Sequence, residues 1–141
     1  MGSTYFGTSI NTSPTITLPA GEKLEDARGI ALVIQNGAVV KPTAGANVIG
    51  ISILETDDVV EQGMDVDIQI KDIGKWVAGE AISAGAELTT NAEGKAVAAK
   101  NGDFITAVAL SSASKAGTWV SVQIMKAGYQ SAAKTEGGEN A

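Results

Sequence analysis

The feature that most constrains the fold of this chain is a succession of short β-type runs separated by glycine turns. The runs recur at spacings of roughly ten residues, which is typical of a β-sandwich or a small barrel. Hydrophobic residues make up 44% of the chain but aromatic residues only 4%. We therefore expect a core of Val, Ile, Leu and Ala, which suit tightly packed sheets. The sequence predicts an all-β fold, either a small antiparallel β-barrel or a β-sandwich.

Two Asn-Gly dipeptides predict tight turns between strands. They are Asn36-Gly37 and Asn101-Gly102. The flanking β-type runs are 30–34 and 38–41 for the first, and 96–99 and 103–110 for the second. An Asn-Gly pair accepts positive φ at both central positions, as a two-residue hairpin requires. We expect antiparallel pairing across both turns.

Alternation of apolar and polar residues predicts which strand faces are buried. In residues 64–71 the apolar side chains share one face and the polar ones the other, as in a half-buried strand. The apolar set is Met64, Val66, Ile68 and Ile70. Residues 48–54 and 104–110 are apolar or small on both faces, so we expect each run to be central or covered on its second side.

We divide the chain into an extended N-terminal arm over residues 1–19, a single β-rich domain over 20–128 and a flexible tail over 129–141. The arm is uncharged and rich in Ser, Thr and Gly, and the tail is polar without a spaced apolar face. Helix signals are confined to residues 22–28 and 111–115. Each is too short to organise the fold.

Composition excludes most catalytic and nucleic-acid chemistry. The chain has no Cys and no His, which removes thiolate nucleophiles, the usual near-neutral base and the commonest metal ligands. Its 10 basic and 16 acidic residues give a net charge of −6, and Arg28 is the single arginine. A phosphate backbone would be repelled. No apolar run approaches the ~20 residues that span a bilayer. We expect a soluble, non-enzymatic protein made in the cytoplasm, with no cofactor, metal, nucleic acid or membrane as a partner.

Acidic residues suggest two sites, and we favour a structural interpretation of both. The carboxylates before Gly63 are Glu55, Asp57, Asp58 and Glu61. They could bind Ca²⁺, but they lack the spacing of a calcium loop, so we favour a solvated turn. Asp65 and Asp67 on one strand face are open to paired-carboxylate chemistry. The polar exterior of a strand explains them equally well.

Apolar side chains that the predicted core does not bury mark a candidate interface with another protein or subunit. In residues 118–125, alternation turns Val120, Val122 and Ile124 inward and leaves Trp119 and Met125 outward. Tyr5, Phe6 and Ile10 lie in the predicted arm. They either pack locally or anchor the arm to another protein.

A prosthetic-group carrier remains an alternative. Residues 124–127 partly resemble the Met-Lys or Lys-Ala tripeptides that carry biotin or lipoate, and residues 77–85 resemble a Gly-containing run of those all-β domains. The carrier lysine lies at a hairpin tip midway through such a fold, whereas Lys126 follows the last predicted strand. A small ligand-binding β module is a further alternative.

The order of these motifs resembles the capsid cement, or head decoration, proteins of tailed bacteriophages. The strongest part is Ala-Ile-Ser-Ala-Gly-Ala-Glu-Leu-Thr-Thr-Asn-Ala-Glu-Gly-Lys-Ala-Val at residues 81–97, followed by Ala-Val-Ala-Leu at 107–110. The resemblance covers roughly residues 14–126.

The resemblance implies a small β-rich protein on the outside of the expanded phage head. Such proteins bind the major capsid protein, often as trimers, and stiffen the shell. We expect the same location and partners here. We also expect that deleting residues 1–13 abolishes capsid binding and leaves thermal unfolding nearly unchanged.

Overall fold

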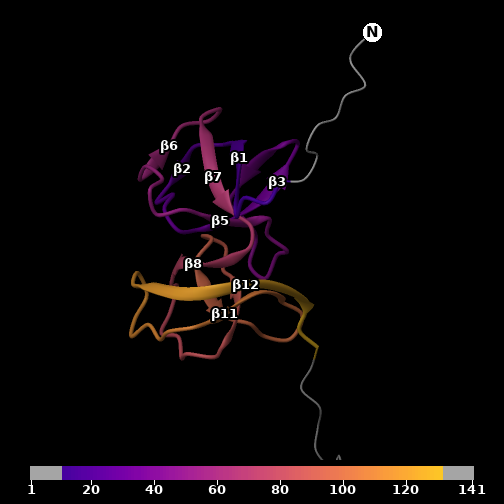
Figure 1. The fold of residues 1–141 in the computed structure, drawn as a ribbon, viewed down its shortest axis with the longest axis vertical. Coiled ribbons are helices and arrows are strands. Elements are labelled where there is room, and N and C mark those ends of the chain that lie inside the picture. The colour runs from indigo at the N-terminus through magenta and orange to yellow at the C-terminus, as the bar shows by residue number, and fades with distance from the viewer. Residues whose placement is uncertain (1–10, 132–141) are drawn as a thin grey trace, which may run out of the picture.

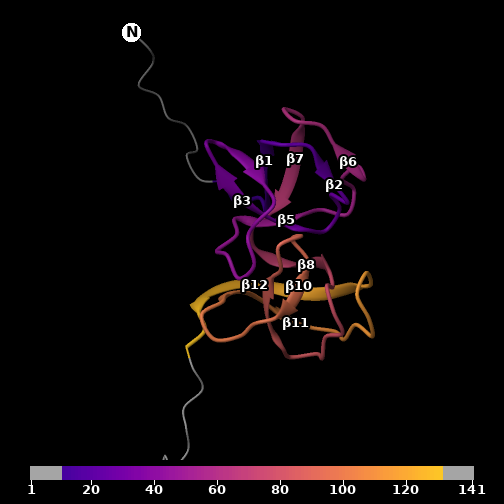
Figure 2. The same ribbon diagram turned by 180° about the vertical axis from the view of Figure 1, so that it is seen from behind.

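The computed structural model describes residues 11–131, and they form an all-β fold of two stacked sheets (Figures 1 and 2). The first sheet contains, in spatial order, β1 (Thr15–Pro19), β7 (Asp65–Gln69), β5 (Gly50–Ser52), β3 (Ala31–Gln35) and β4 (Ala38–Val40). The second contains β10 (Ala96–Ala98), β9 (Glu87–Thr90), β11 (Phe104–Ala109), β12 (Trp119–Tyr129) and β8 (Asp72–Val77). A two-stranded ribbon joins β2 (Leu24–Glu25) to β6 (Val59–Val60).

The predicted all-β class is confirmed, and the architecture is sandwich-like, without a closed barrel. The strand ladders are antiparallel. An isolated parallel bridge links the two edges of each sheet, Ala20 with Val39 in the first and Ala78 with Ala96 in the second. No helix in the part of the chain that the structure describes is long and apolar enough to cross a membrane.

The two sheets have the same topology. If the strands are counted within each sheet, both run in the spatial order first, fifth, fourth, second, third. The registers also match: Leu18 pairs with Val66 in the first sheet, as Trp76 pairs with Val120 in the second. We call residues 15–69 the first repeat and residues 72–129 the second repeat.

Matching hydrogen bonds support this equivalence. The Gly21 and Gly79 amides donate to the carbonyls of Val39 and Ala96, at 2.8 and 2.7 Å. In the next positions, a carboxylate oxygen of Glu22 accepts from the Lys41 amide and one of Glu80 accepts from the Ala98 amide, both at 2.9 Å. Each repeat thus uses an Ala-Gly-Glu segment, at 20–22 and 78–80, to join its first strand to its third.

The two repeats are stacked, and the second takes part of its core from the first. The core of the first repeat consists of its own residues, with Leu24, Ile30, Leu32, Val39 and Ile68 among them. The core of the second repeat includes Trp76, Leu88, Val120 and Val122 and also takes Ala31, Val48 and Ile51 from the first. Alternate residues of β3 therefore face different cores. The part of the first sheet's outer face around β3 and β5 covers the inner face of the second sheet.

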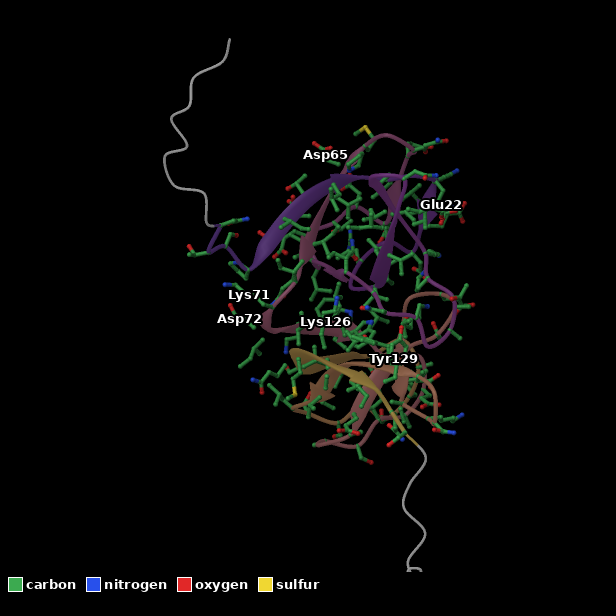
Figure 3. The ribbon with its side chains drawn as sticks, turned by 90° about the vertical axis from the view of Figure 1, so that its right-hand side faces the viewer. Glu22, Asp65, Lys71, Asp72, Lys126 and Tyr129 are labelled. Atoms are coloured by element: carbon green, nitrogen blue, oxygen red, sulfur yellow. The ribbon has the colours of Figure 1, made fainter. Side chains whose placement is uncertain are left out.

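The connection between the repeats is short and closely packed. Figure 3 shows Lys71 and Asp72 at this junction. The Gln69 side chain donates to the carbonyls of Lys71 and Ile73, at 2.8 and 3.0 Å. A Cβ at Gly74 would overlap that same side chain. The two sheets are therefore held together by packing as well as by the chain.

Of the two predicted hairpins, one is confirmed and one is wrong. Gln35 pairs with Ala38 across Asn36 and Gly37, whose φ values are 54° and 79°. Asn101-Gly102 does form a turn, closed by the Asp103 amide on the Lys100 carbonyl at 2.9 Å. However, β9 lies between β10 and β11, so these strands are not paired with each other. An Asn-Gly pair fixes a turn, whereas the pairing of its flanks depends on strands elsewhere in the chain.

The predicted strand faces are largely confirmed. All of β5 is buried, as is β11 apart from half-buried Val108. Val66 and Ile68 are buried on β7, but Met64 is 59% exposed because it precedes the first residue of the strand. Leu110, which follows β11, is also exposed.

The two segments with helix signals contain no helix, and the end of the predicted arm forms a strand. Within residues 22–28, Leu24–Glu25 form β2, and Ala113 of the second segment forms a bridge with Ile82. Residues 15–19, at the end of the predicted arm, form β1 and pair with β7. Residues 1–10 and 132–141 lie outside the described residues, and the division into arm, domain and tail stays a prediction.

Candidate interface surface

Strand β12 places Trp119 and Met125 outward, as predicted. Val120, Val122 and Ile124 are buried, whereas Trp119 is 55% and Met125 51% exposed. This alternation follows from pleating, because β12 crosses the second sheet with one face against the core (Figure 1). The outward placement is therefore confirmed, and the interface role of both residues stays a prediction.

Neighbouring strands add apolar side chains to the same face. Ile73 on β8 pairs with Gln123, and Lys75 pairs with Ser121. The Leu110 amide donates to the Ser121 carbonyl at 2.7 Å, which places Leu110 beside them. We call this surface the Trp119 face. Its members are Ile73, Lys75, Leu110, Trp119, Ser121, Gln123 and Met125.

The Trp119 face combines polar residues on β8 and β12 with large exposed apolar side chains. Lys75 Nζ donates to Ser121 Oγ at 2.6 Å. Ile73 is 64% exposed and Leu110 is 45% exposed. Such a cluster on a sheet surface is typical of a binding face. Sequence patterns did not indicate Ile73 and Leu110, because only the register between strands brings them beside Trp119.

The arm residues of the predicted interface lie outside the described residues. These are Tyr5, Phe6 and Ile10. Their role in anchoring the chain stays a prediction.

Lys126 lies in a bulge of β12 rather than at a hairpin tip (Figure 3). Between matched pairs, β12 spans residues 124–128 where β11 spans 105–107, and Lys126 has a φ of 48°. Its Nζ lies 5.7 Å from the centroid of the Phe104 ring, which Tyr129 contacts edge-on. Burial lowers the pKa of this amine. The partly buried position differs from that of a carrier lysine, which projects from a turn.

The acidic loop of the first repeat surrounds a cavity of about 420 Å³. Its lining includes Glu55, Asp57, Glu61, Asp65 and Asp67, together with the exposed side chains of Val59 and Met64. Within residues 11–131 no group of three or more acidic side chains is arranged to hold a metal ion.

Local contacts hold two of the carboxylates in this region, Asp67 and Asp58. The Thr17 hydroxyl donates to Asp67 at 2.6 Å, as expected of polar residues paired across a strand exterior. Arg28 Nε donates to the Thr56 carbonyl at 2.6 Å and lies 3.2 Å from Asp58. The single arginine thus ties the loop to the start of β3.

Comparison with solved structures relates this architecture to a phage head protein. The structure aligns with "head fiber gp8.5 N base in bacteriophage phi29" at a TM-score of 0.61, over 82% of this chain and 97% of that chain. The two chains share one fold. At 18% identity, the likeness extends to the architecture alone. No protein-family model matches the sequence, and no curated protein matches it.

Proposed function

We propose that this protein is a structural component of a tailed-phage head that binds the outer surface of the expanded capsid and stabilises the shell. The observation that carries the proposal is the fold shared with the phi29 head-fibre base, which is matched over almost its whole length. The sequence resemblance to capsid cement proteins supports the same role independently, since it rests on motifs and not on coordinates.

The partners in this proposal are the major capsid protein and further copies of the chain, with a trimer favoured. A trimer that touches several capsid subunits binds tightly even when each contact is weak, because its binding sites share a high effective concentration. Expansion of the head would bring these sites into matching positions. The protein would be made in the host cytoplasm and reside on the virion surface, without enzymatic activity or a cofactor.

Co-sedimentation with phage heads tests this function. The purified full chain is mixed with unexpanded and with expanded heads of a phage that lacks its own copy of the protein. We expect saturable binding to expanded heads alone and a higher temperature of DNA release from the decorated heads. Failure of the folded protein to bind expanded heads of its own phage would contradict the proposal.

Deletion of residues 1–13 tests the contribution of the arm. We expect the truncated chain to lose binding to heads and to unfold at nearly the same temperature as the full chain, because β1 begins only at Thr15. A truncated chain that still saturates the heads would exclude the arm as the anchor without excluding capsid binding by the remaining domain.

A further inference from the structure

A groove between the two repeats brings an exposed tryptophan together with charged side chains from both repeats. It lies on the side of the molecule that carries both the β2–β6 ribbon and the start of β12 (Figures 1 and 2). A cavity of about 250 Å³ in this groove is lined by Trp119. It adjoins a larger cavity of about 570 Å³, and the two share Asp26, Asp58 and Lys95. Arg28 completes the charged side chains around the smaller cavity. We call the two cavities the inter-repeat groove.

The charges around the smaller cavity form two ion pairs. Lys95 Nζ lies 3.2 Å from Asp26 Oδ2, and this pair joins the second repeat to the first. Arg28 Nε lies 3.2 Å from Asp58 Oδ1. The two pairs cancel, so the smaller cavity is neutral although the whole chain carries a net charge of −6. A site of this kind favours an uncharged ligand, because neither an anion nor a cation meets an unpaired opposite charge there.

The ion pairs orient these groups and leave hydrogen-bonding atoms open to a ligand. The side chains of Asp26 and Asp58 are 74% and 76% exposed, and that of Arg28 is 48% exposed. Within residues 11–131, the Arg28 guanidinium donates from Nε alone, to the Thr56 carbonyl. Its terminal amino groups therefore remain as a planar fork of donors, and the carboxylates beside it remain as acceptors. Hydroxyl groups, which both donate and accept, match such a set.

Trp119 supplies a flat apolar surface at one end of the groove. The residue is the first of β12 and pairs with Val77, and its side chain is 55% exposed. The other tryptophan, Trp76, is completely buried. An indole ring offers a large, rigid contact area at a low entropic cost. The C–H face of a sugar ring stacks on such a surface while its hydroxyls point to the side. A nucleotide chain is disfavoured, because the net charge repels its phosphates.

We propose that the inter-repeat groove binds an uncharged saccharide. One sugar ring stacks on Trp119, and its hydroxyls bind the Arg28 fork and the exposed carboxylates beside it. The smaller cavity lies near the lower limit of small-molecule sites, about 300 Å³, which suits a single ring. The larger cavity extends the groove for further sugar units. This inference goes beyond the proposed function and does not depend on it. On the outside of a virion, many copies of a weak site would bind tightly to a surface that displays the sugar.

A glycan array tests the class of ligand. The purified full chain is applied to uncharged oligosaccharides of glucose, galactose, mannose, rhamnose and N-acetylglucosamine. Oligomers of galacturonate and of glucosamine are the acidic and basic counterparts. We expect binding to at least one uncharged series, and weaker binding or none to the charged oligomers. Absence of binding to every uncharged sugar would overturn the inference, as would binding confined to a charged oligomer.

Fluorescence and calorimetry with the uncharged oligosaccharide that binds best on the array test the place of binding. Acrylamide quenches exposed indoles, so it reports on Trp119 and not on buried Trp76. We expect the sugar to protect Trp119 from quenching. Trp119→Ala should weaken binding by about 10-fold or more, as loss of an aromatic anchor does. Arg28→Lys should also weaken it, because the charge is kept and the planar fork is lost.

Tyr129→Ala is the matched control, because Tyr129 is an exposed aromatic side chain on the same strand but outside the groove. It should leave the affinity unchanged, and thermal unfolding checks that each variant is folded. A Trp119→Ala chain that binds as tightly as the wild type would overturn the assignment of the groove. So would a Trp119 that acrylamide cannot reach in the free chain, since another copy would then cover it. Binding to heads is measured separately, so each function is judged on its own.

Discussion

The two repeats share one strand order but differ in what covers them. The first repeat is acidic, and the part of its outer sheet face that includes Ala31 and Ile51 is buried under the second repeat. The second repeat is neutral, and the positions that strand register matches to these two, Glu87 and Val108, are exposed and half-buried. The backbone pairing is thus compatible with very different side chains.

Equivalent positions show how the side chains adapt. Trp76 is completely buried and its Nε1 donates to the Gly94 carbonyl at 2.8 Å, whereas Leu18 at the same position in the first repeat is half-buried. The larger side chain at Trp76 fills the space between the two sheets, where residues of both repeats pack together. Leu18 packs against the core of the first repeat alone.

The largest expected effect distinguishes these two positions. Trp76→Ala should lower the free energy of unfolding by about 3–5 kcal/mol, because it opens a cavity under both sheets and leaves the Gly94 carbonyl without its indole donor. Leu18→Ala should cost no more than about 2 kcal/mol, since its side chain is already half in water. Urea denaturation of both variants measures the difference. Equal losses in the free energy of unfolding would contradict this prediction, because they would show that Trp76 and Leu18 stabilise the protein equally.

The two turns that follow the second strand of each repeat provide the next comparison. Gly37 and Gly94 both have positive φ, at 79° and 85°. A Cβ on Gly37 meets nothing within 4 Å, whereas one on Gly94 would lie 2.7 Å from the Ala31 carbonyl oxygen. Gly37→Ala should cost about 1–2 kcal/mol. Gly94→Ala should cost about 2–4 kcal/mol, because steric overlap between the repeats is added. Denaturation midpoints that move equally would contradict this role for Gly94.

A smaller effect is expected at the fourth strand of each repeat, where Gly50 and Ala107 are equivalent. A Cβ on Gly50 would overlap the Gln69 carbonyl and lie 2.8 Å from the Ile68 side chain. We expect Gly50→Ala to destabilise the protein by about 1–3 kcal/mol. The reverse exchange, Ala107→Gly, should cost roughly 1 kcal/mol. Thermal unfolding of the pair tests whether β5 has space for a side chain.

The smallest effect concerns Lys126, in a bulge that the strand pairs of the first sheet lack within the described residues. Burial lowers the pKa of Lys126 below 10.5, so between the lowered value and 10.5 the unfolded chain binds more protons than the folded one. The free energy of unfolding therefore rises with pH across that window. Lys126→Met should lose this rise.

Urea denaturation at neutral pH and again just below pH 10.5 measures this change. Lys115→Met, at an exposed position, is the control for loss of one lysine. A wild-type chain and a Lys126→Met chain with the same pH dependence would show that partial burial does not disfavour the charged amine of Lys126.

Local sequence patterns predicted the class of fold and the direction of individual side chains. Asn36-Gly37 predicted its hairpin because positive φ is a local property. The alternation from Val120 to Ile124 predicted the buried face of β12 for a similar reason. The same alternation was wrong at Met64, because a periodic pattern continues beyond the end of the strand that it describes.

These local patterns did not predict which strands pair when they are far apart in the sequence. Nothing local to Asn101-Gly102 indicates that β9 enters between its two flanks. The repeat did leave a sequence signal, since Ala-Gly-Glu occurs at residues 20–22 and 78–80, and Gln-Ile occurs at the matching positions 69–70 and 123–124. The signal is short, and it acquires meaning only when both segments are seen to make the same hydrogen bonds.

Each repeat is built from an uninterrupted stretch of sequence, and this has a consequence for synthesis on the ribosome. The five strands of the first sheet are complete by Gln69, before any strand of the second has been translated. Domains of a nascent chain generally fold in the order in which they emerge. The first sheet can therefore form early, with Ala31 and Ile51 exposed to solvent until β12 has been translated and the second sheet packs over them.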